Sequence, residues 1–372
     1  MDLSSIRIRE HFGLIANDSH GDKFSFLISS PQGRLSLEKN DYVLVNHPLI
    51  GDAGQVLAVI NEVSSYEEIA GSTVNDKKAK MLATAEIIGF IDLRKENRKI
   101  EKLLVPPNPG SRVYVPLRDF LEDVLNRNTK GESFRTPVQV GTLEGLSAEE
   151  RAKTKDGIIK SCMDANEFTT KNTLISGVSG TGKTAITQKI LTAIHEKATQ
   201  RIIIIDPYDE YRHLSAAEFK ITSKPNQESL LKESETHKIM RLTAKGLLIQ
   251  ERQSGYVEFL KLVLKLRLEE KIDPILLVVE EAEILKGSAL EEAVTSGSKI
   301  KLALCLLTTH PSELGGKILS NISNQLIGKT IDAEDKLFLK NTIGKTDIAE
   351  LLVGEWIING VNRDRPLKTH VD

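Results

Sequence analysis

The sequence predicts an α/β protein built on a parallel sheet and preceded by a small all-β domain. From about residue 170, apolar segments alternate with helical segments, which is typical of a parallel sheet covered on both faces. Over the first ~100 residues, short segments of alternating polarity are separated by turn-forming residues. That pattern indicates a small barrel or sandwich.

The N-terminal domain is expected to contain several short strands. They are Phe24–Ile28, Tyr42–Val45, Gln55–Ile60 and Ala85–Ile91. The proline-rich run at 105–111 cannot continue a helix or a central strand. A helix is expected after it, over Leu117–Leu125, because apolar positions recur there every three to four residues. We therefore expect a small β-barrel at 1–105 and a linker with a helical segment at 106–170.

The second half of the chain is expected to supply the strands of the parallel sheet. They are Asn172–Ser176, Arg201–Ile205, Pro274–Val279, Leu302–Leu307 and Trp356–Ile358. A helix is expected over Thr184–Lys197. The charged segment at about 212–272 is expected to be a helical insertion, with a strong helical stripe over Tyr256–Leu268. Residues 171–372 together are expected to form one α/β domain.

Composition excludes some classes of protein. The chain has 372 residues and a formal net charge of −2, so it is no basic coat for nucleic acid, and any contact with DNA must be local. Apolar runs such as Ile275–Val279 are far shorter than the ~20 residues of a membrane-spanning helix. The N-terminus has no apolar signal core, and Cys162 and Cys305 have no metal-ligand spacing. A cytoplasmic protein without a membrane segment is expected.

The segment 177–184 reads Gly-Val-Ser-Gly-Thr-Gly-Lys-Thr and matches the phosphate-binding pattern G-x-x-x-x-G-K-[ST] in full. Its glycines permit turns that a side chain would block, and its N–H groups point at phosphate oxygens ahead of a helix N-terminus. Lys183 is expected to contact the β- and γ-phosphates of ATP, and Thr184 to bind Mg²⁺. The expected nucleotide-binding residues are Gly177, Ser179, Gly180, Thr181, Gly182, Lys183, Thr184 and Ala185.

A second motif, at 275–283, is an apolar strand that ends in paired acids. After a P-loop this is the Walker B pattern. Glu280 is expected to reach Mg²⁺ through water, and Glu281 to polarise the attacking water. Glu283 is better interpreted as a solvated acid at a helix start. The second acid favours hydrolysis used for mechanical work over phosphate transfer to a small molecule.

These motifs resemble those of the HerA/FtsK superfamily of DNA-translocating ATPases, and the HerA branch above all. Ile204–Tyr211 is similar to that branch's strand followed by Asp-Pro-His-Gly-Glu-Tyr, and Val279–Ala282 to its Glu-Glu-Ala. Gly297–Ser312 follows its Gly-Arg-Lys to Gln-Arg-Pro-Ser segment, and Leu352–Gly360 with Arg365-Pro366 resembles its closing strands. The N-terminal β region resembles the small barrel that precedes the motor.

The resemblance implies a RecA-like P-loop motor that works as a homo-oligomeric, hexameric ring, with ATP between subunits and double-stranded DNA through the pore. It also implies a nuclease or other effector partner, in DNA repair at DNA ends or in anti-phage defence. A nucleotide-gated scaffold that activates an effector with little translocation is the alternative. A conjugation- or secretion-type ATPase is a third possibility.

The chain departs from the family pattern around the expected γ-phosphate. Thr309 replaces the sensor glutamine and is expected to contact that phosphate, while His310 and Ser298 replace arginines. Lys329 stands where a trans-acting arginine finger is expected, and lysine cannot make the planar bidentate contact of arginine. Hydrolysis that is slow without ring assembly or a partner is therefore expected.

Some residues have two interpretations each. Asp206 and Glu210 lie near the nucleotide, or form a cap and a surface salt bridge. Lys299 and Lys301 track DNA phosphates in the pore, or are solvated at a strand start. Of the basic runs in the barrel, Lys77–Lys80 and Arg94–Lys99, the second alternates with acids and is interpreted as a solvated surface.

Overall fold

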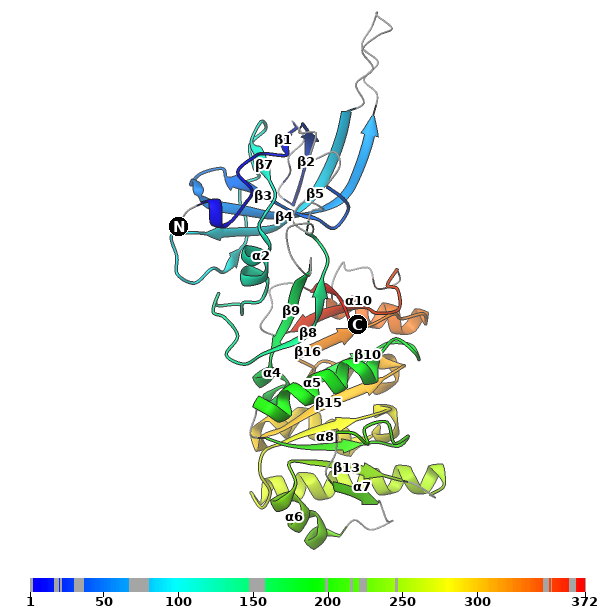
Figure 1. Ribbon diagram of the computed structural model, residues 1–372. Coiled ribbons are helices and arrows are strands. Elements are labelled where there is room, and N and C mark those ends of the chain that lie inside the picture. The colour runs from blue at the N-terminus through cyan, green and yellow to red at the C-terminus, as the bar shows by residue number, and fades with distance from the viewer. Residues whose placement is uncertain are drawn as a thin grey trace, which may run out of the picture. The chain divides into compact units, whose positions relative to one another are not determined.

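The computed structural model of the protein divides the chain into two compact units. The first comprises Met1–Phe134 and Thr142–Ser161, and the second Arg135–Gly141 and Cys162–Asp372. Figure 1 shows the elements of both units. The structure describes residues 3–16, 20, 22–29, 37–66, 80–146, 158–197, 200–214, 217–220, 226–244, 247–343, 348, 350–360 and 366–371.

The first unit contains a closed six-stranded barrel, which confirms the expected small β-barrel. Its strands, with β6 attached at the side, are β1 (Gly13–Ile15), β2 (Lys23–Ile28), β3 (Tyr42–His47), β4 (Gly51–Tyr66), β5 (Lys80–Asp92), β6 (Ile100–Glu101) and β7 (Arg112–Tyr114). The strand order is β2-β1-β7-β3-β4-β5, and pairing of β2 with β5 closes the ring. Figure 1 shows β4 and β5 as two long neighbouring strands, which pair antiparallel.

Apolar side chains fill the barrel, because alternate residues of each strand point inward. Phe24, Phe26, Val43 and Val45 are completely buried. Two barrel strands, β1 and β7, have three residues each, too few for a pattern of alternation. β7 follows the proline-rich run, so the segment expected to be a linker contributes a strand to the barrel.

The helix α2 (Arg118–Leu125) agrees with the sequence prediction, and it buries Phe120, Leu121, Val124 and Leu125. A short 3₁₀ helix, η1 (Leu3–Ser5), lies near the N-terminus. Both belong to the first unit. The chain then enters the second unit at Arg135, returns at Thr142, and leaves the first unit for good after Ser161.

The second unit is built on an eleven-stranded sheet whose seven strands on one side pair in parallel. The strands are β8 (Pro137–Leu143), β9 (Ile159–Asp164), β10 (Thr173–Ser176), β11 (Arg201–Ile205), β12 (Ala217–Lys220), β13 (Ile239–Thr243), β14 (Ile275–Val279), β15 (Leu302–Thr308), β16 (Asn324–Ile327), β17 (Glu355–Gly360) and β18 (Leu367–His370). Their order is β12-β13-β11-β14-β15-β10-β16-β17-β18-β8-β9. Strands β12 to β16 of this order pair in parallel, whereas β17 is antiparallel to β16 and to β18.

Helices cover both faces of this sheet, as the sequence predicts. They are α4 (Ala165–Thr170), α5 (Lys183–Lys197), α6 (Gln227–Thr236), α7 (Ile249–Leu268), α8 (Ser288–Ser296), α9 (Gly316–Leu319) and α10 (Ala333–Ile343), with the 3₁₀ turns η2 (Ala282–Leu285), η3 (Gly297–Ile300) and η4 (Pro311–Leu314). Ile203 and Ile205 of β11 join the core under α7 and α8, while Ile202 and Ile204 join the core under α4 and α5.

The segment at 212–272, expected to be a helical insertion, contains α6 and α7 but also two strands of the sheet. β12 and β13 continue the parallel order beyond β11. β13 is hard to predict from the sequence, because it has a charged residue, Arg241, at its centre and buried arginines are rare. The helical stripe of α7 agrees with the prediction, and Tyr256, Leu260 and Val263 are buried.

No helix in the described part of the chain combines the length and the apolar character that a membrane crossing requires.

Candidate nucleotide site

The expected site residues gather at the edge of the sheet that is formed by the carboxyl ends of the parallel strands. The P-loop, residues 177–182, joins the end of β10 to the start of α5. The acids Glu280 and Glu281 follow β14, and the segment 206–211 follows β11. Because β11, β14, β15 and β10 are parallel neighbours, their carboxyl ends lie side by side. Ligands of open α/β sheets bind at this edge.

Glycines are required at two turns of the P-loop. Gly180 and Gly182 have φ angles of +79° and +93°, a region that strains residues with a side chain. At Gly177 a side chain is excluded for a different reason, because a Cβ there would lie 2.8 Å from the Thr181 hydroxyl. That buried hydroxyl donates to the carbonyl of Val178 at 2.8 Å. The glycine pattern thus has the structural role that the motif predicts.

Backbone hydrogen bonds attach the P-loop to the strands beside it. The Val178 N–H donates to the carbonyl of Lys329 at 2.9 Å, and the Gly177 N–H to that of Thr308 at 3.3 Å. The Gly328 N–H donates to Ser176 at 2.8 Å. The loop is therefore fixed by main-chain groups of β15 and of the residues after β16.

The Lys183 ammonium lies inside the P-loop and beside Thr309. Its Nζ donates to the carbonyls of Gly177 at 2.8 Å and Val178 at 3.4 Å, and lies 3.5 Å from the Thr309 hydroxyl. Burial lowers the pKa of Lys183, although the nearby carboxylates of Glu280 and Glu283 oppose that shift. The structure thus brings Lys183 and Thr309 together, as the sequence predicts.

The Thr184 hydroxyl contacts a carboxylate of the β11 segment. It donates to Glu210 Oε2 at 2.6 Å. The Glu210 backbone carbonyl accepts a bond from the Gln188 amide at 3.3 Å, which ties that segment to α5. Thr184, Glu210 and Glu280 supply the hydroxyl and carboxylate oxygens that Mg²⁺ prefers, so this donor set fits the metal.

Glu280 is a buried acid with an aromatic partner. Its side chain is 7% exposed and accepts a hydrogen bond from the Tyr211 hydroxyl. Burial raises the pKa of Glu280 to about 7, and the Glu210 carboxylate adds to that shift. The Tyr211 bond and the Lys183 charge act against it. Burial and the Glu280 carboxylate also raise the pKa of Tyr211.

Glu281 stands at the sharp turn that ends β14. Its φ of 51° and ψ of 62° lie in the left-handed region, which is uncommon for a residue other than glycine. Its carboxylate is exposed and accepts a hydrogen bond from the Tyr208 hydroxyl, which lies 2.8 Å from Oε2. That bond raises the pKa of Tyr208.

The segment that carries both tyrosines is fixed by a buried ion pair. Asp206 is fully buried and accepts the N–H groups of Glu210 at 2.9 Å and Tyr211 at 3.0 Å. Arg241, whose side chain is 3% exposed, lies 3.1 Å from Asp206 Oδ2 and also pairs with Asp209. Of the two interpretations of Asp206, the structure supports the cap. Glu210, by contrast, lies beside Thr184 in the site.

Glu283 lies in the first turn of η2, as the interpretation of an acid at a helix start expects, but it is half-buried and paired rather than solvated. Its carboxylate accepts hydrogen bonds from the Thr308 hydroxyl and from the His310 N–H, which joins the ends of β14 and β15. The His310 ring in turn lies 3.2 Å from the buried carboxylate of Asp335 on α10. No sequence pattern predicts these contacts, because each joins positions 25 or more residues apart.

The remaining predicted residues lie around the P-loop and at the opposite end of the parallel strands. Ser179 and Ala185 are exposed on the loop and on the first turn of α5. Lys329 is half-buried and lies beside the P-loop of its own chain through its carbonyl. Its role as a trans-acting finger stays a prediction. Lys299 and Lys301 are exposed before β15, at the sheet edge opposite the P-loop. Of the basic run Lys77–Lys80, residues 77–79 lie outside the described residues.

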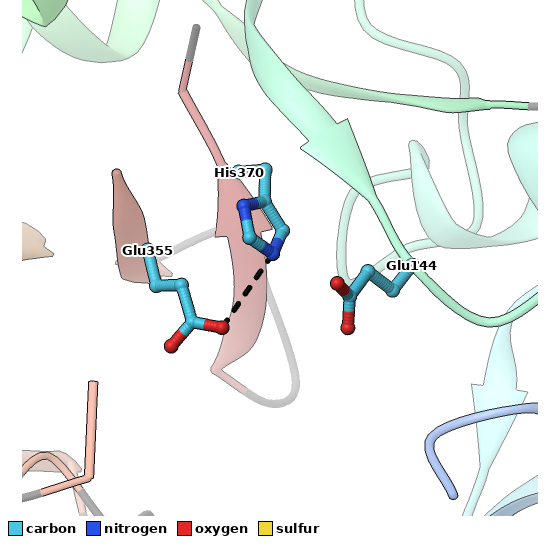
Figure 2. Close-up of side chains that lie close together, drawn as sticks. All are labelled: Glu144, Glu355 and His370. Carbon is cyan, nitrogen blue, oxygen red and sulfur yellow. Dashed lines mark ion pairs between the residues drawn. The ribbon is translucent and has the colours of Figure 1, made fainter. Parts of the chain in front are cut away.

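A separate group of charges joins β17 to β18 (Figure 2). Glu355, which is 6% exposed, pairs with Lys368 at 2.7 Å and with His370 at 3.5 Å. Burial alone would raise the pKa of Glu355, but the Leu352 N–H and Lys368 outweigh burial and lower it. This group holds together β17 and β18, an antiparallel pair inside the sheet. Glu144, also labelled in Figure 2, belongs to the first unit.

Comparison with known families agrees with this site. The model of the family described as "Helicase HerA, central domain" matches residues 138–337, more than half of the chain. The chain belongs to this HerA family. The match contains the P-loop, the 206–211 segment and both Walker B acids. The HerA-type chain therefore has the fold of P-loop NTPases, with a RecA-like core and an N-terminal barrel.

Two curated proteins are similar to parts of this HerA-type chain. An uncharacterized protein of Aquifex aeolicus is 29% identical over 138 residues, which are 37% of this chain and 45% of that protein. A probable helicase of Methanocaldococcus jannaschii is 26% identical over 220 residues, 54% of this chain and 38% of that protein. The chain thus spans less than half the length of these relatives.

Solved structures also resemble the HerA-type chain. The genome packaging NTPase B204 of Sulfolobus turreted icosahedral virus 2, in complex with AMP, is 14% identical with a TM-score of 0.42, over 56% of this chain and 100% of that one. VirB4 of Thermoanaerobacter pseudethanolicus is 12% identical with a TM-score of 0.48, over 64% of this chain and 97% of that one.

Proposed function

We propose that the chain is an ATP-driven motor that translocates on or unwinds double-stranded DNA as a homo-oligomeric, hexameric ring. One observation carries the proposal: Lys183, Thr184 and the two Walker B acids meet at one sheet edge, and the second acid is anchored by Tyr208. A second acid suits hydrolysis of ATP rather than transfer of phosphate. Membership of the HerA helicase family and the similarity to the probable helicase of M. jannaschii support DNA as the polymer along which the motor moves.

In the proposed hydrolysis, Glu281 accepts a proton from water while the water oxygen bonds to the γ-phosphorus. The bond from that phosphorus to the β–γ bridging oxygen breaks, which gives ADP and phosphate. The Lys183 ammonium stabilises the charge on the phosphate oxygens. Mg²⁺, held by the Thr184 hydroxyl and through water by Glu280, would supply further positive charge at those oxygens.

A ring is proposed because the sequence of a single chain offers no arginine finger over residues 310–362. From His310 to Asn362 the sequence has no arginine, and arginine fingers contribute about 10³–10⁵ in rate. Thr309 stands where the family pattern has a sensor glutamine, and Lys329 where a trans-acting arginine finger is expected. We propose that assembly into a ring, with a nuclease or other effector as partner, supplies the missing stabilisation. That partnership would serve DNA repair or anti-phage defence.

A duplex-translocation assay tests the proposal. The oligomer is incubated with ATP, Mg²⁺ and a long DNA duplex that carries a third strand as a roadblock, and release of that strand is measured. We expect ATP-dependent release and a faster ATP turnover with the duplex. Lys183→Ala, as the control, should abolish both. Absence of any strand release and of any DNA-stimulated turnover would contradict the motor.

The second candidate is a nucleotide-gated scaffold that activates an effector. Thr309 and His310, which replace a longer amide and an arginine of the family pattern, favour it. The same assay separates the two functions. A scaffold hydrolyses ATP slowly, changes its assembly with nucleotide, and releases no strand.

A further inference from the structure

The contact between Tyr208 and Glu281 has no counterpart in the P-loop or Walker B motifs. The two residues are 73 positions apart, and the Tyr208 hydroxyl lies 2.8 Å from Glu281 Oε2. Since the carboxylate has two oxygens, this bond occupies one and leaves Oε1 for water. We propose that Tyr208 is a positioning residue for ATP hydrolysis, which holds Glu281 in the orientation that accepts the proton of water. The inference rests on the ATPase reaction proposed above.

Glu281 needs such an anchor because its own surroundings do not fix it. Its side chain is exposed, and a glutamate has three rotatable bonds whose freedom opposes any single orientation. The left-handed backbone, with φ of 51°, fixes only where the side chain starts. A general base must lie within hydrogen-bond reach of the proton that it accepts. The Tyr208 bond supplies the missing restraint at the far end of the side chain.

Tyr208 can restrain its partner because its own segment is rigid. Pro207 has a fixed φ, and the buried Asp206 before it accepts two backbone N–H groups and pairs with Arg241. Beyond Tyr208, Glu210 bonds the Thr184 hydroxyl and Tyr211 bonds Glu280. Three side chains of one short segment thus each contact a different residue of the nucleotide site.

The tyrosine ring itself contributes little to the core. It is 58% exposed, so loss of the hydroxyl alone should leave folding unchanged. The experiment is therefore steady-state ATP hydrolysis by Tyr208→Phe in the full chain, with Mg²⁺. We expect kcat to fall about tenfold, because a hydrogen bond to a charged group is lost at the reacting step, and KM to stay unchanged.

Tyr256→Phe is the matched control. Tyr256 lies on α7, and its buried hydroxyl has no hydrogen-bond partner among the described residues. The same loss of a hydroxyl there should leave kcat unchanged. A purely structural effect of tyrosine removal would instead appear as a lower melting temperature in the affected variant.

A double-mutant cycle shows whether Tyr208 acts through Glu281. Tyr208→Phe is introduced beside Glu281→Gln, and single-turnover cleavage of ATP is measured in both backgrounds. Loss of the Tyr208 effect in the Glu281→Gln background supports the inference. An equal fall in both backgrounds, an unchanged kcat, or a raised kcat in Tyr208→Phe would overturn it. A wild-type chain that cleaves no ATP would instead reject the ATPase reaction itself.

Discussion

The P-loop and the segment 206–211 serve the same site but are held by different interactions. Main-chain hydrogen bonds to Lys329 and Thr308 fix the P-loop, and its glycines permit the turns. The segment 206–211 is held by side chains, above all by the buried pair of Asp206 and Arg241. A loop fixed by its backbone tolerates changes of side chain, whereas a segment that depends on one buried cation does not.

The largest effect should follow a change that leaves the P-loop backbone intact but removes its charge. Lys183→Ala should reduce ATP turnover by at least about 10³-fold, because the phosphate charge loses its fixed partner. Folding should persist, since main-chain bonds hold the loop. Lys189→Ala, an exposed lysine on the same helix, is the control for turnover. Unchanged hydrolysis in Lys183→Ala would remove the chemical basis of the site.

The second prediction concerns the ion pair of Asp206 and Arg241 that anchors the segment 206–211. Arg241→Met should lower the free energy of unfolding by about 3–5 kcal/mol, because it leaves the buried carboxylate of Asp206 without its cation. Urea denaturation measures the change. Arg212→Ala is the matched control, since Arg212 also pairs with Asp209 but is 67% exposed. That variant should cost less than about 0.5 kcal/mol. Equal losses in both variants would contradict the anchor.

The third prediction concerns the buried acid that both regions approach. The pKa of Glu280, about 7 in the fold, exceeds the ordinary glutamate value of 4.5, so the folded state favours the protonated form. The contribution of this group to stability is present below pH 4.5 and is lost as the pH rises to about 7. At most about 3 kcal/mol is involved, at 1.36 kcal/mol for each pKa unit.

Glu280→Gln should therefore raise the melting temperature at pH 8, measured in EDTA without nucleotide, and should have little effect at pH 4.5. It should also slow ATP hydrolysis, because the glutamine carries no negative charge toward Mg²⁺. A variant that is less stable than the wild type at pH 8 would show that the Glu280 carboxylate stabilises the fold instead.

The same contrast explains what the sequence could predict. The P-loop was predictable because its function depends on glycines and one lysine within eight consecutive residues. The strands β10, β11, β14 and β15 were predictable from apolar runs. β13 was not, because Arg241 interrupts the pattern, and a single sequence does not show that its partner is Asp206. β12 has only four residues, two of them charged, and so has no apolar run. The three-residue strands β1 and β7 are too short for a pattern of alternation.

Contacts between positions far apart in the chain also could not be predicted from the sequence. The sequence marks 206–211 as a strand end with a family resemblance, but it does not show that Tyr208 meets Glu281 or that Tyr211 meets Glu280. Parallel topology could have suggested proximity, since β11 and β14 end side by side. The choice of partner depends on side-chain geometry that only the folded chain defines.

The central claim is that Glu281 activates water for the cleavage of ATP held by the P-loop. Single-turnover cleavage of γ-labelled ATP by the assembled protein, compared with Glu281→Gln, tests it most directly. We expect both proteins to bind ATP with similar affinity, and the variant to cleave it about 10²–10⁴-fold more slowly. Cleavage by Glu281→Gln at the wild-type rate would contradict the account.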